Sequence, residues 1–229
     1  MIVLYDARMP QKAAEALAYY ATAVPLITHG VTDDILSGHP DVFCCNIEPV
    51  PVVAPNMPLP VVQQMQQCGI DFVFGKQNTG QGKYANAHYN AVVSENYILH
   101  HIASTDESIL CRCDTHKRIN VKQSLTRCTT IALKNNMFIT SDGGVDKQLK
   151  QNCLNVMYVE CRDILLPGVK YGCIGGCMGL CEDTLFVIGS MKYCAQGDKM
   201  VNFVSNMGYR IIELYDGPLY DGGSLCFMQ

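Results

Sequence analysis

The segment GGSLCFMQ at residues 222–229 ends the chain with two glycines and a short apolar strand that no helix follows. Upstream of it, the sequence repeats one pattern five times. Each copy has short apolar runs, a helix opened by a capping signal, and a β-branched or aromatic run after the helix stop. The first copy lacks a full set of leading strands, and the C-terminal strand can supply the missing one. The sequence therefore predicts a ring in which the last strand pairs beside the first, so that no sheet edge stays open.

The start and stop residues of the helices make the repeat visible. Pro60 is suited to a first helical position, and Gly69 to a helix stop. Ser104 and Glu107 have the spacing of a capping box, and Ser141 or Asp142 can cap the fourth helix. The helices are expected at residues 10–21, 60–68, 104–113, 142–149 and 198–207, each followed by a strand, at 24–27, 70–74, 119–121, 155–159 and 209–215.

Further strands are expected before the later helices, so the repeating unit is ββαβ rather than a simple βα alternation. They cover residues 42–47, 90–93, 97–101, 128–133, 137–141 and 185–190. Five units in 229 residues give about 46 residues each, a length typical of propeller or array repeats. The fold class is therefore α/β, with one domain over residues 1–229. A doubly wound α/β sheet is the alternative, and the paired leading strands favour the ring.

Composition excludes several classes of protein. With 48% hydrophobic and 17% charged residues and no apolar run of bilayer length, the chain is neither disordered nor a membrane protein. The N-terminal run is interrupted by Asp6 and is expected to be a strand, not a signal peptide. A net charge of −4 with scattered Lys and Arg argues against nucleic acid as a partner. The oligomeric state stays open.

Thirteen cysteines without a secretory signal indicate a reducing cytoplasm and free, mostly buried thiols. Cys173, Cys177 and Cys181 recur at four-residue intervals, but the glycines among them argue against a helix. No C-x-x-C pair occurs in the chain. We therefore expect packing cysteines, with no metal and no cofactor. Cys113, which lies close to His116, is likewise assigned to a helix core face.

At this level of organisation the chain resembles the pentein superfamily, the α/β propellers of the guanidino-group-modifying enzymes, and within it an uncharacterised bacterial branch. The resemblance rests on the five ββαβ units and on DGGSLCFMQ at 221–229, HPDV at 39–42 and YANAHYNAVV at 84–93. It implies a five-bladed α/β propeller around a pseudo-fivefold axis, closed by the C-terminal strand and enclosing a central polar pocket. The superfamily includes deiminases, dimethylarginine hydrolases, amidinotransferases and a non-enzymatic branch that binds the ribosome.

The resemblance also implies a chemistry for Cys226. In the family enzymes a cysteine thiolate attacks the guanidinium carbon, a histidine carries protons and carboxylates clamp the cationic nitrogens. Cys226 stands after the Gly-Gly pair, where the family nucleophile is expected. Two features depart from the family pattern: GGCMG at 175–179 replaces the usual histidine and acid, and Leu225 replaces the His or Arg before the cysteine.

Other side chains are candidates for the missing roles. His39 is a second candidate catalytic residue, with Asp41 beside it, although both also fit a capped turn before a strand. His88 is a third, and strand alternation would place it on the same side as Asn86 and Asn90. That polar row lines a wet pocket or lies in a solvated loop. The remaining candidates for substrate binding are Asp216 and Asp221, which also suit turns.

Two functional hypotheses follow from these residues and from the resemblance. The first is a cysteine-dependent guanidino or amidine hydrolase, deiminase or amidinotransferase with an atypical site. The second is a protein on the same fold that binds a small ligand, or another macromolecule, without catalysis. For the enzyme and for a protein that binds a small ligand, the expected ligand is a small guanidino or amidine compound.

Overall fold

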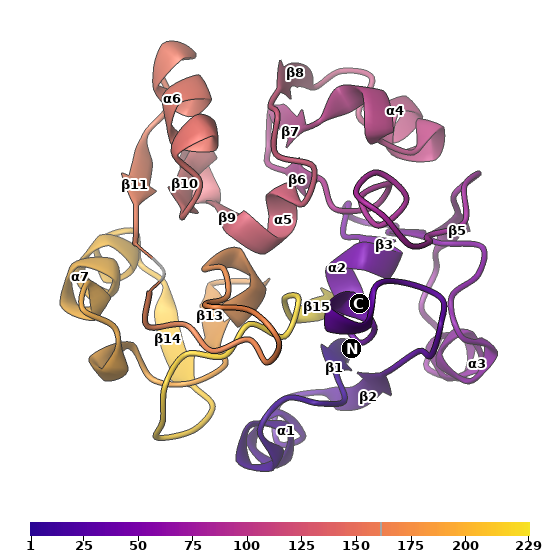
Figure 1. Cartoon of the computed structure of the whole chain (residues 1–229), viewed down its shortest axis with the longest axis horizontal. Helices are drawn as coiled ribbons and strands as arrows, with labels where there is room; N and C mark the ends of the chain where they lie inside the picture. The colour runs from indigo at the N-terminus through magenta and orange to yellow at the C-terminus, as the bar shows by residue number, and fades with distance from the viewer. Residues whose placement is uncertain (161) are drawn as a thin grey trace.

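The computed structural model describes residues 1–160 and 162–229, and these form five three-stranded sheets. Figure 1 shows the sheets arranged around the middle of the molecule, with the longer helices on the outside. The sheets consist of β15 (Cys226–Met228), β1 (Ile2–Asp6) and β2 (Thr22–Leu26); β3 (Cys44–Cys45), β4 (Val52–Val53) and β5 (Val73–Phe74); β6 (Val92–Val93), β7 (Tyr97–His100) and β8 (Lys117–Asn120); β9 (Thr130–Leu133), β10 (Met137–Thr140) and β11 (Val156–Tyr158); and β12 (Met178–Cys181), β13 (Thr184–Val187) and β14 (Arg210–Glu213).

Each sheet has the same connectivity. Its middle strand pairs antiparallel with the first strand and parallel with the third. A parallel pair needs a crossover, which an α-helix supplies between the middle and third strands. These crossover helices are α1 (Gln11–Leu17), α3 (Leu59–Gln67), α4 (Glu107–Arg112), α6 (Gly143–Gln151) and α7 (Gly197–Asn206). The predicted ββαβ unit is therefore confirmed.

The C-terminal strand completes the first sheet. β15 pairs antiparallel with β1, with Leu4 opposite Cys226 and Ile2 opposite Met228. Because β1 would otherwise have one open edge, this pairing uses the last residues of the chain to satisfy the backbone of the first. The predicted pairing of the last strand beside the first is thus confirmed, and it brings Cys226 to the middle of the molecule.

The helix caps were predicted with mixed success. Asp142 caps α6, because its Oδ1 accepts a hydrogen bond of 2.8 Å from the N–H of Val145. The predicted capping box at Ser104 is wrong, since Ser104 ends a short 3₁₀ turn, η2 (Ile102–Ser104). Asp106 caps α4 instead, and its carboxylate accepts from the N–H of Ser108. The cap therefore lies two residues later than predicted, and a carboxylate takes the place of the serine hydroxyl.

Three of the predicted leading strands begin later than expected, because a short turn precedes each of them. Residues 40–43 form α2 (Pro40–Phe43), so only Cys44 and Cys45 remain in β3. Residues 126–129 likewise form α5 (Thr126–Thr129), which delays β9. In the third sheet, residues 83–89 are turns and β6 starts only at Val92. The glycine-rich segment gives a 3₁₀ turn, η4 (Gly175–Cys177), followed by β12, a strand that the sequence reading missed.

The apolar residues of the strands and helices form the core. The predicted core residues Met65, Val145 and Leu149 are fully buried, whereas Cys68 at the end of α3 is exposed, contrary to expectation. In the part of the chain that the structure describes, no helix has the length and apolar character needed to cross a bilayer.

Candidate functional site

Five turns lead into the first strands of the five sheets, and hydrogen bonds connect them in a circle. We call them the leading turns: α2, residues 87–90, α5, η4 and residues 222–224. Asn90 donates to the carbonyl of Asp41, and the N–H of Arg127 donates to that of Asn90. Next, the guanidinium of Arg127 donates to the carbonyl of Gly175. The N–H groups of Gly222 and Ser224 donate to the carbonyl of Gly176. The N–H of Asp41 donates to the carbonyl of Gly223, which closes the circle. The circle holds the innermost residues of all five sheets in fixed relative positions.

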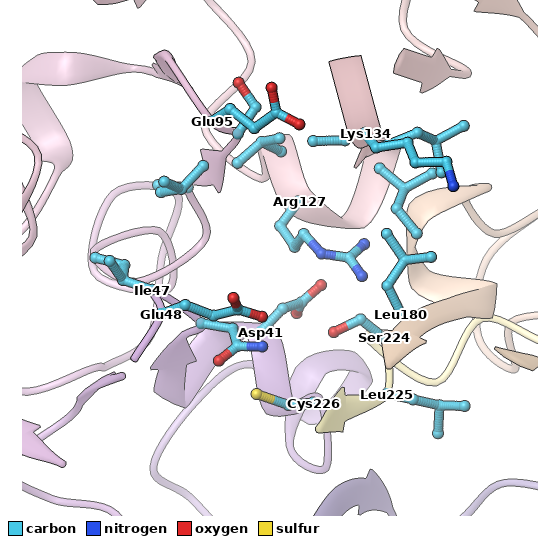
Figure 2. Close-up of a pocket in the computed structure, with 18 of the residues that line it drawn as sticks. Asp41, Ile47, Glu48, Glu95, Arg127, Lys134, Leu180, Ser224, Leu225 and Cys226 are labelled. Atoms are coloured by element: carbon cyan, nitrogen blue, oxygen red, sulfur yellow. The ribbon is translucent and has the colours of Figure 1, made fainter. Parts of the chain in front are cut away.

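A cavity of about 740 Å³ opens beside the leading turns, and residues of all five sheets line it. We call it the central cavity. Figure 2 shows the guanidinium of Arg127, the carboxyl of Asp41 and the thiol of Cys226 among the side chains that line it. Asp41 and Cys226 are buried, so they mark its inner end. Its lining includes Ser224 and Cys226 of the first unit, Asp41, Cys44 and Glu48 of the second, residues 91–95 with Arg112 and His116 of the third, Arg127 and residues 131–134 of the fourth, and Leu180, Glu182, Asp183 and Tyr209 of the fifth.

Carboxylates outnumber Lys and Arg side chains in the lining of this cavity, five to three. Lys134 is partly neutralised, because its Nζ lies 3.2 Å from Oδ1 of Asp183. Glu48 and Glu182 lie at the exposed rim. A cleft lined by an excess of one charge raises the local concentration of the opposite charge. The cavity therefore favours a cation.

Two thiols meet at the inner end of the central cavity. Sγ of Cys226 in β15 lies 3.6 Å from Sγ of Cys44 in β3, and both side chains are buried. The hydrogen bond with Cys226, followed by burial, raises the pKa of Cys44 well above its usual range. Cys44 therefore remains a thiol at neutral pH and can donate to Cys226. The structure places Cys226 in the cavity, as predicted, but with a second thiol as its contact.

Asp41 is the acid nearest the inner end of the cavity. Burial raises the pKa of its carboxyl to about 6, an effect that His39, the Cys128 thiol and Arg127 partly offset. Its Oδ2 accepts a hydrogen bond of 3.0 Å from Sγ of Cys128. A carboxyl that titrates near neutrality can both accept and donate a proton, which is the property required of a general acid or base.

Arg127 is a cavity residue that the sequence reading missed. Its guanidinium donates to the carbonyls of Gly175 at 2.7 Å and Met178 at 3.0 Å, which ties α5 to the fifth unit. Burial lowers the pKa of Arg127, partly offset by Asp41. Superposing the repeats would have identified it, since Arg127 is the second residue of its leading turn, as Asp41 is of its own.

His39 lies behind the cavity and is not part of its lining. It is the N-cap residue of α2, has the extended backbone expected before Pro40, and is 1% exposed. Its Nε2 lies 3.8 Å from Oδ2 of Asp6. Gly223 passes against the imidazole with a φ of +63°, and a Cβ there would overlap the ring. Glycine is therefore required at position 223 for His39 to occupy this place.

A family of unknown function (DUF6873) matches residues 4–226. The chain belongs to this family. No curated protein matches the sequence. Two solved structures share the fold: DDAH from Pseudomonas aeruginosa, as a cysteine-to-serine mutant complexed with citrulline, and a dimethylarginine dimethylaminohydrolase adduct with 4-chloro-2-hydroxymethylpyridine. Their TM-scores are 0.51 and 0.50 and their identities 10% and 11%, and in both cases the match covers 93% of this chain and 91% of the other.

Both solved structures are penteins, so this DUF6873 member has the pentein fold suggested by its repeats. At such low identity the likeness concerns the fold and does not extend to the side chains of the site.

The predicted polar row of Asn86, His88 and Asn90 does not form in this DUF6873 protein. Residues 83–89 are turns, closed by backbone hydrogen bonds such as Asn86 N–H to Gly82, so strand alternation does not apply. Asn86 donates to Asp33 at 2.6 Å, and Nδ1 of His88 lies 2.8 Å from the carbonyl of Ser104. The three side chains thus contact different parts of the molecule.

Asn90 is the member of that row whose side chain contacts the two neighbouring leading turns, α2 and α5. Its amide oxygen accepts from the N–H of Arg127 at 2.7 Å and of Cys128 at 3.2 Å, the first turn of α5. Its Nδ2 donates to the carbonyl of Asp41 at 3.1 Å. Asn90 therefore acts as a cap and a bridge between α2 and α5, and its hydrogen-bonding groups are used inside the protein.

The two remaining aspartates lie in different environments. Asp221 is buried, and its oxygens accept from the N–H groups of Cys173 and Gly223. Burial raises its pKa, and the nearby His39 partly offsets that effect. Asp216 is exposed and its Oδ1 lies 2.5 Å from Nζ of Lys192, outside the cavity lining.

The cysteines at 177 and 181 have different neighbours. Sγ of Cys177 donates to the carbonyl of Cys173, and Sγ of Cys181 lies 3.2 Å from Sδ of Met1. Of the neighbours Cys113 and His116, Cys113 is buried at the end of α4, whereas His116 lines the cavity. Among the described residues, neither group forms a cluster of three or more metal-ligating side chains.

Proposed function

We propose that the five sheets are the blades of an α/β propeller around a pseudo-fivefold axis, and that the central cavity binds a small guanidino or amidine compound with which Cys226 reacts. The observation that carries the proposal is that the thiol of Cys226 lies at the inner end of one acidic cavity together with Asp41, a carboxyl whose pKa burial raises to about 6. The pentein fold shared with DDAH supports the choice of ligand class.

The cavity offers charge complementarity to such a ligand. A planar guanidinium or amidinium presents parallel N–H donors, which carboxylates accept in paired, charge-assisted hydrogen bonds. Asp41 lies in α2, and Glu48 lies shortly after β3, the strand that follows α2. Both residues line the cavity. We assign Glu48 to the ligand's cationic nitrogens at the rim and Asp41 to the reacting end.

The proposed reaction has two steps. In the first, the Cys226 thiolate forms a C–S bond to the guanidinium carbon, and the C–N bond to the leaving amine breaks as protonated Asp41 gives that amine a proton. In the second, water attacks the same carbon, Asp41 accepts one of its protons, the C–S bond breaks to restore the thiolate, and the product releases the remaining proton of the water to solvent. In this proposal Asp41 carries the protons that a histidine carries in the pentein enzymes.

A second candidate function is binding without turnover. One observation favours it: the Arg127 guanidinium already occupies part of the inner cavity beside Asp41. A positive group there weakens binding of a second cation close to Asp41. In this case the ligand's cationic end would stay at the rim carboxylates.

Turnover assays separate the two candidates. Guanidino and amidine compounds are incubated with the protein, and release of amine, ammonia or urea is measured alongside calorimetric binding. Hydrolysis that disappears in Cys226→Ala and in Asp41→Asn, with binding retained, supports the enzyme. Binding without product supports the second candidate, and the absence of both rejects the ligand class. Cys113→Ala, a buried cysteine outside the cavity, is the matched control.

A further inference from the structure

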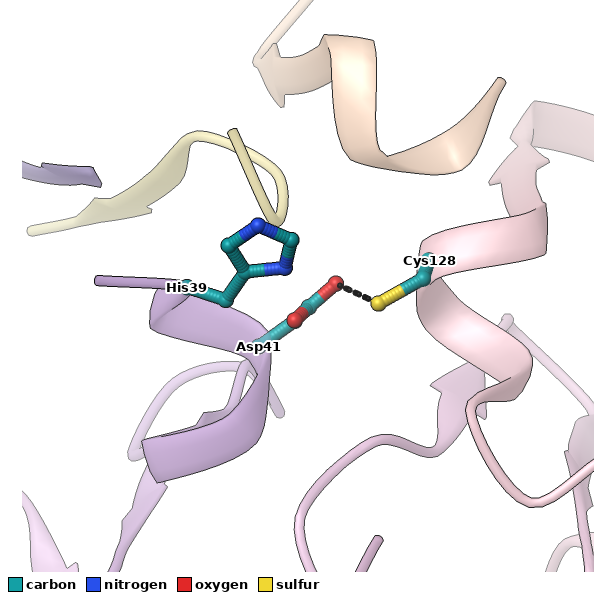
Figure 3. A group of neighbouring side chains, drawn as sticks. All are labelled: His39, Asp41 and Cys128. Carbon is teal, nitrogen blue, oxygen red and sulfur yellow. Dashed lines mark hydrogen bonds between the residues drawn. The ribbon is translucent and has the colours of Figure 1, made fainter. Parts of the chain in front are cut away.

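Three side chains of different chemistry converge behind the central cavity. One ligand atom each of His39, Asp41 and Cys128 lies within 4.8 Å of the other two, and all three residues are buried. Figure 3 shows one imidazole nitrogen facing the Asp41 carboxyl, which in turn reaches the Cys128 thiol. Since Nε2 of His39 lies on the side of Asp6, the nitrogen facing Asp41 is Nδ1.

This group is short of hydrogen-bond partners. Within the part of the chain that the structure describes, both ring nitrogens of His39 and Oδ1 of Asp41 are buried without a hydrogen bond. Leaving a buried polar atom unpaired costs about 1–3 kcal/mol, and native proteins keep few of them. Two of these atoms, Nδ1 of His39 and Oδ1 of Asp41, belong to the two side chains that face each other, which indicates that a bound group belongs between them.

We propose that His39, Asp41 and Cys128 form a binding site for a zinc-type divalent cation. Imidazole nitrogen, carboxylate oxygen and thiolate sulfur are the three ligand types that Zn²⁺ uses, at about 2.0–2.3 Å each. Thiolate sulfur disfavours Mg²⁺ and Ca²⁺, which select oxygen ligands. Three protein ligands leave a fourth tetrahedral position for water. The site is distinct from the thiol pair of Cys226 and Cys44, and it was not expected from the sequence.

The charges around the group suit a cation. Asp221 is a further buried carboxyl close to both His39 and Asp41. Asp6 faces the far nitrogen of His39, in the position of the carboxylate that orients a metal-bound imidazole in many proteins. The guanidinium of Arg127 is the positive group beside Asp41, and its N–H groups are bound to backbone carbonyls. Loss of the Cys128 thiol proton on binding would offset one of the two positive charges that a divalent ion brings.

The ligands are held in place by the leading turns. Asn90 fixes α2 to α5 through Asp41 and Cys128, and Gly223 presses against the ring of His39. Asp41 also lines the central cavity, which gives an ion a path from solvent. A preorganised set of ligands with an access path is what a metal site requires.

Binding exchanges protons of the ligand side chains for the metal. Zn²⁺ forms bonds to Nδ1 of neutral His39, to the Asp41 carboxylate and to the Cys128 sulfur, and the Cys128 thiol proton passes to solvent. Any proton on Asp41 leaves with it. No oxidation or reduction occurs. Because the metal takes Asp41, the loaded protein is expected to lose the proton carrier proposed for turnover.

Cobalt(II) titration of the intact, chelator-treated protein tests the site. We expect one Co²⁺ per chain with the near-ultraviolet charge-transfer band of a cobalt–thiolate bond and the visible bands of tetrahedral cobalt. Both signals should disappear in Cys128→Ala and persist in Cys113→Ala, a buried cysteine at the C-terminal end of α4. His39→Ala is a second ligand variant, in which the visible bands should be lost or altered. An identical spectrum in Cys128→Ala would overturn the proposal.

Crystals of the wild-type protein grown with zinc keep the test independent of variant folding. The anomalous difference map should show a peak bonded to His39, Asp41 and Cys128; no peak there, or a peak only at other cysteines, contradicts the site. Cys226→Ala distinguishes this proposal from the proposed function, because that variant should lose turnover and keep the cobalt spectrum.

Discussion

The Sγ atoms of Cys226 and Cys44 lie 3.6 Å apart, on strands of two different sheets that are remote in sequence. The contact exists because the C-terminal strand β15 pairs with β1 at the middle of the molecule, next to the leading turn of the second sheet. Since Cys44 stays protonated at neutral pH, it is placed to donate a hydrogen bond to a thiolate on Cys226. Cys44 thus supports the reactivity proposed for Cys226.

Removing Cys44 should therefore slow the alkylation of Cys226. In Cys44→Ala we expect the rate with iodoacetamide at pH 7 to fall about fivefold, because a lost hydrogen bond contributes roughly 1 kcal/mol. The rate is measured by mass spectrometry of the peptide containing Cys226. Cys45→Ala is the control, since Sγ of Cys45 points to the carbonyl of Ala91 instead. An unchanged rate in Cys44→Ala would show that the contact has no effect on the thiolate.

The titration of Asp41 predicts a pH-dependent stability. Its pKa is about 6 in the folded protein and 3.8 in an exposed carboxyl, so the folded state binds more protons between these values. The free energy of unfolding then contains a contribution that is lost as the pH rises from about 4 to about 6, worth roughly 3 kcal/mol. Asp41→Asn should lack it and should be the more stable protein at pH 7 without metal.

The measurement is urea unfolding of both proteins in chelator across that pH range. Burial lowers the pKa of His100 to about 4, so His100 contributes a slope of the opposite sign, with stability lost as the pH falls below 6.5. This contribution is present in both proteins and cancels in the difference. If the difference between wild type and Asp41→Asn is independent of pH, the carboxyl of Asp41 does not titrate as described.

Asn90 should matter for stability. Asn90→Ala leaves the N–H of Cys128 at the start of α5 and the carbonyl of Asp41 without their partner. We expect a loss of about 3 kcal/mol in the free energy of unfolding, measured by urea denaturation. Asn155→Ala, at an exposed position, should change it by less than about 0.5 kcal/mol. Equal effects of the two substitutions would contradict the bridging role.

Arg127 is predicted to need its planar, forked donor group. Arg127→Lys keeps the charge but cannot span the carbonyls of Gly175 and Met178 in the same way. A loss of about 2 kcal/mol in the free energy of unfolding is expected, against little change for Arg162→Lys, which is exposed. Full stability in Arg127→Lys would mean that charge alone is sufficient there.

The fold could be predicted because its signals are local. Pro60, Gly69 and Asp142 mark helix ends by chemistry that acts within a few residues, and the orphan C-terminal strand indicated its own partner. The errors arose where a tertiary contact decides the local structure. Asn90 caps α5 from another sheet, and this contact turns the start of a predicted strand into a helical turn.

The site was less predictable for the same reason. Cys226 and Asp41 were identified from a motif resemblance and from residue type, and the structure brings both to the central cavity. Arg127 and Cys128 carry no motif, and their proximity to Asp41 depends on the circle of leading turns. Asn86 and His88 were grouped by an alternation that applies only to strands, whereas their backbone forms turns.

The most direct test of the proposed function is a comparison of chloroacetamidine with chloroacetamide as alkylating agents for Cys226. The two differ in the amidinium cation that the cavity is proposed to bind. We predict that chloroacetamidine modifies Cys226 at least about tenfold faster than chloroacetamide, since one charge-assisted hydrogen bond contributes roughly 1.5–3 kcal/mol. The exposed Cys68 should show no such preference. Equal preference at Cys226 and Cys68, resolved by peptide mass spectrometry, would contradict an amidine-binding cavity with Cys226 as its reacting thiol.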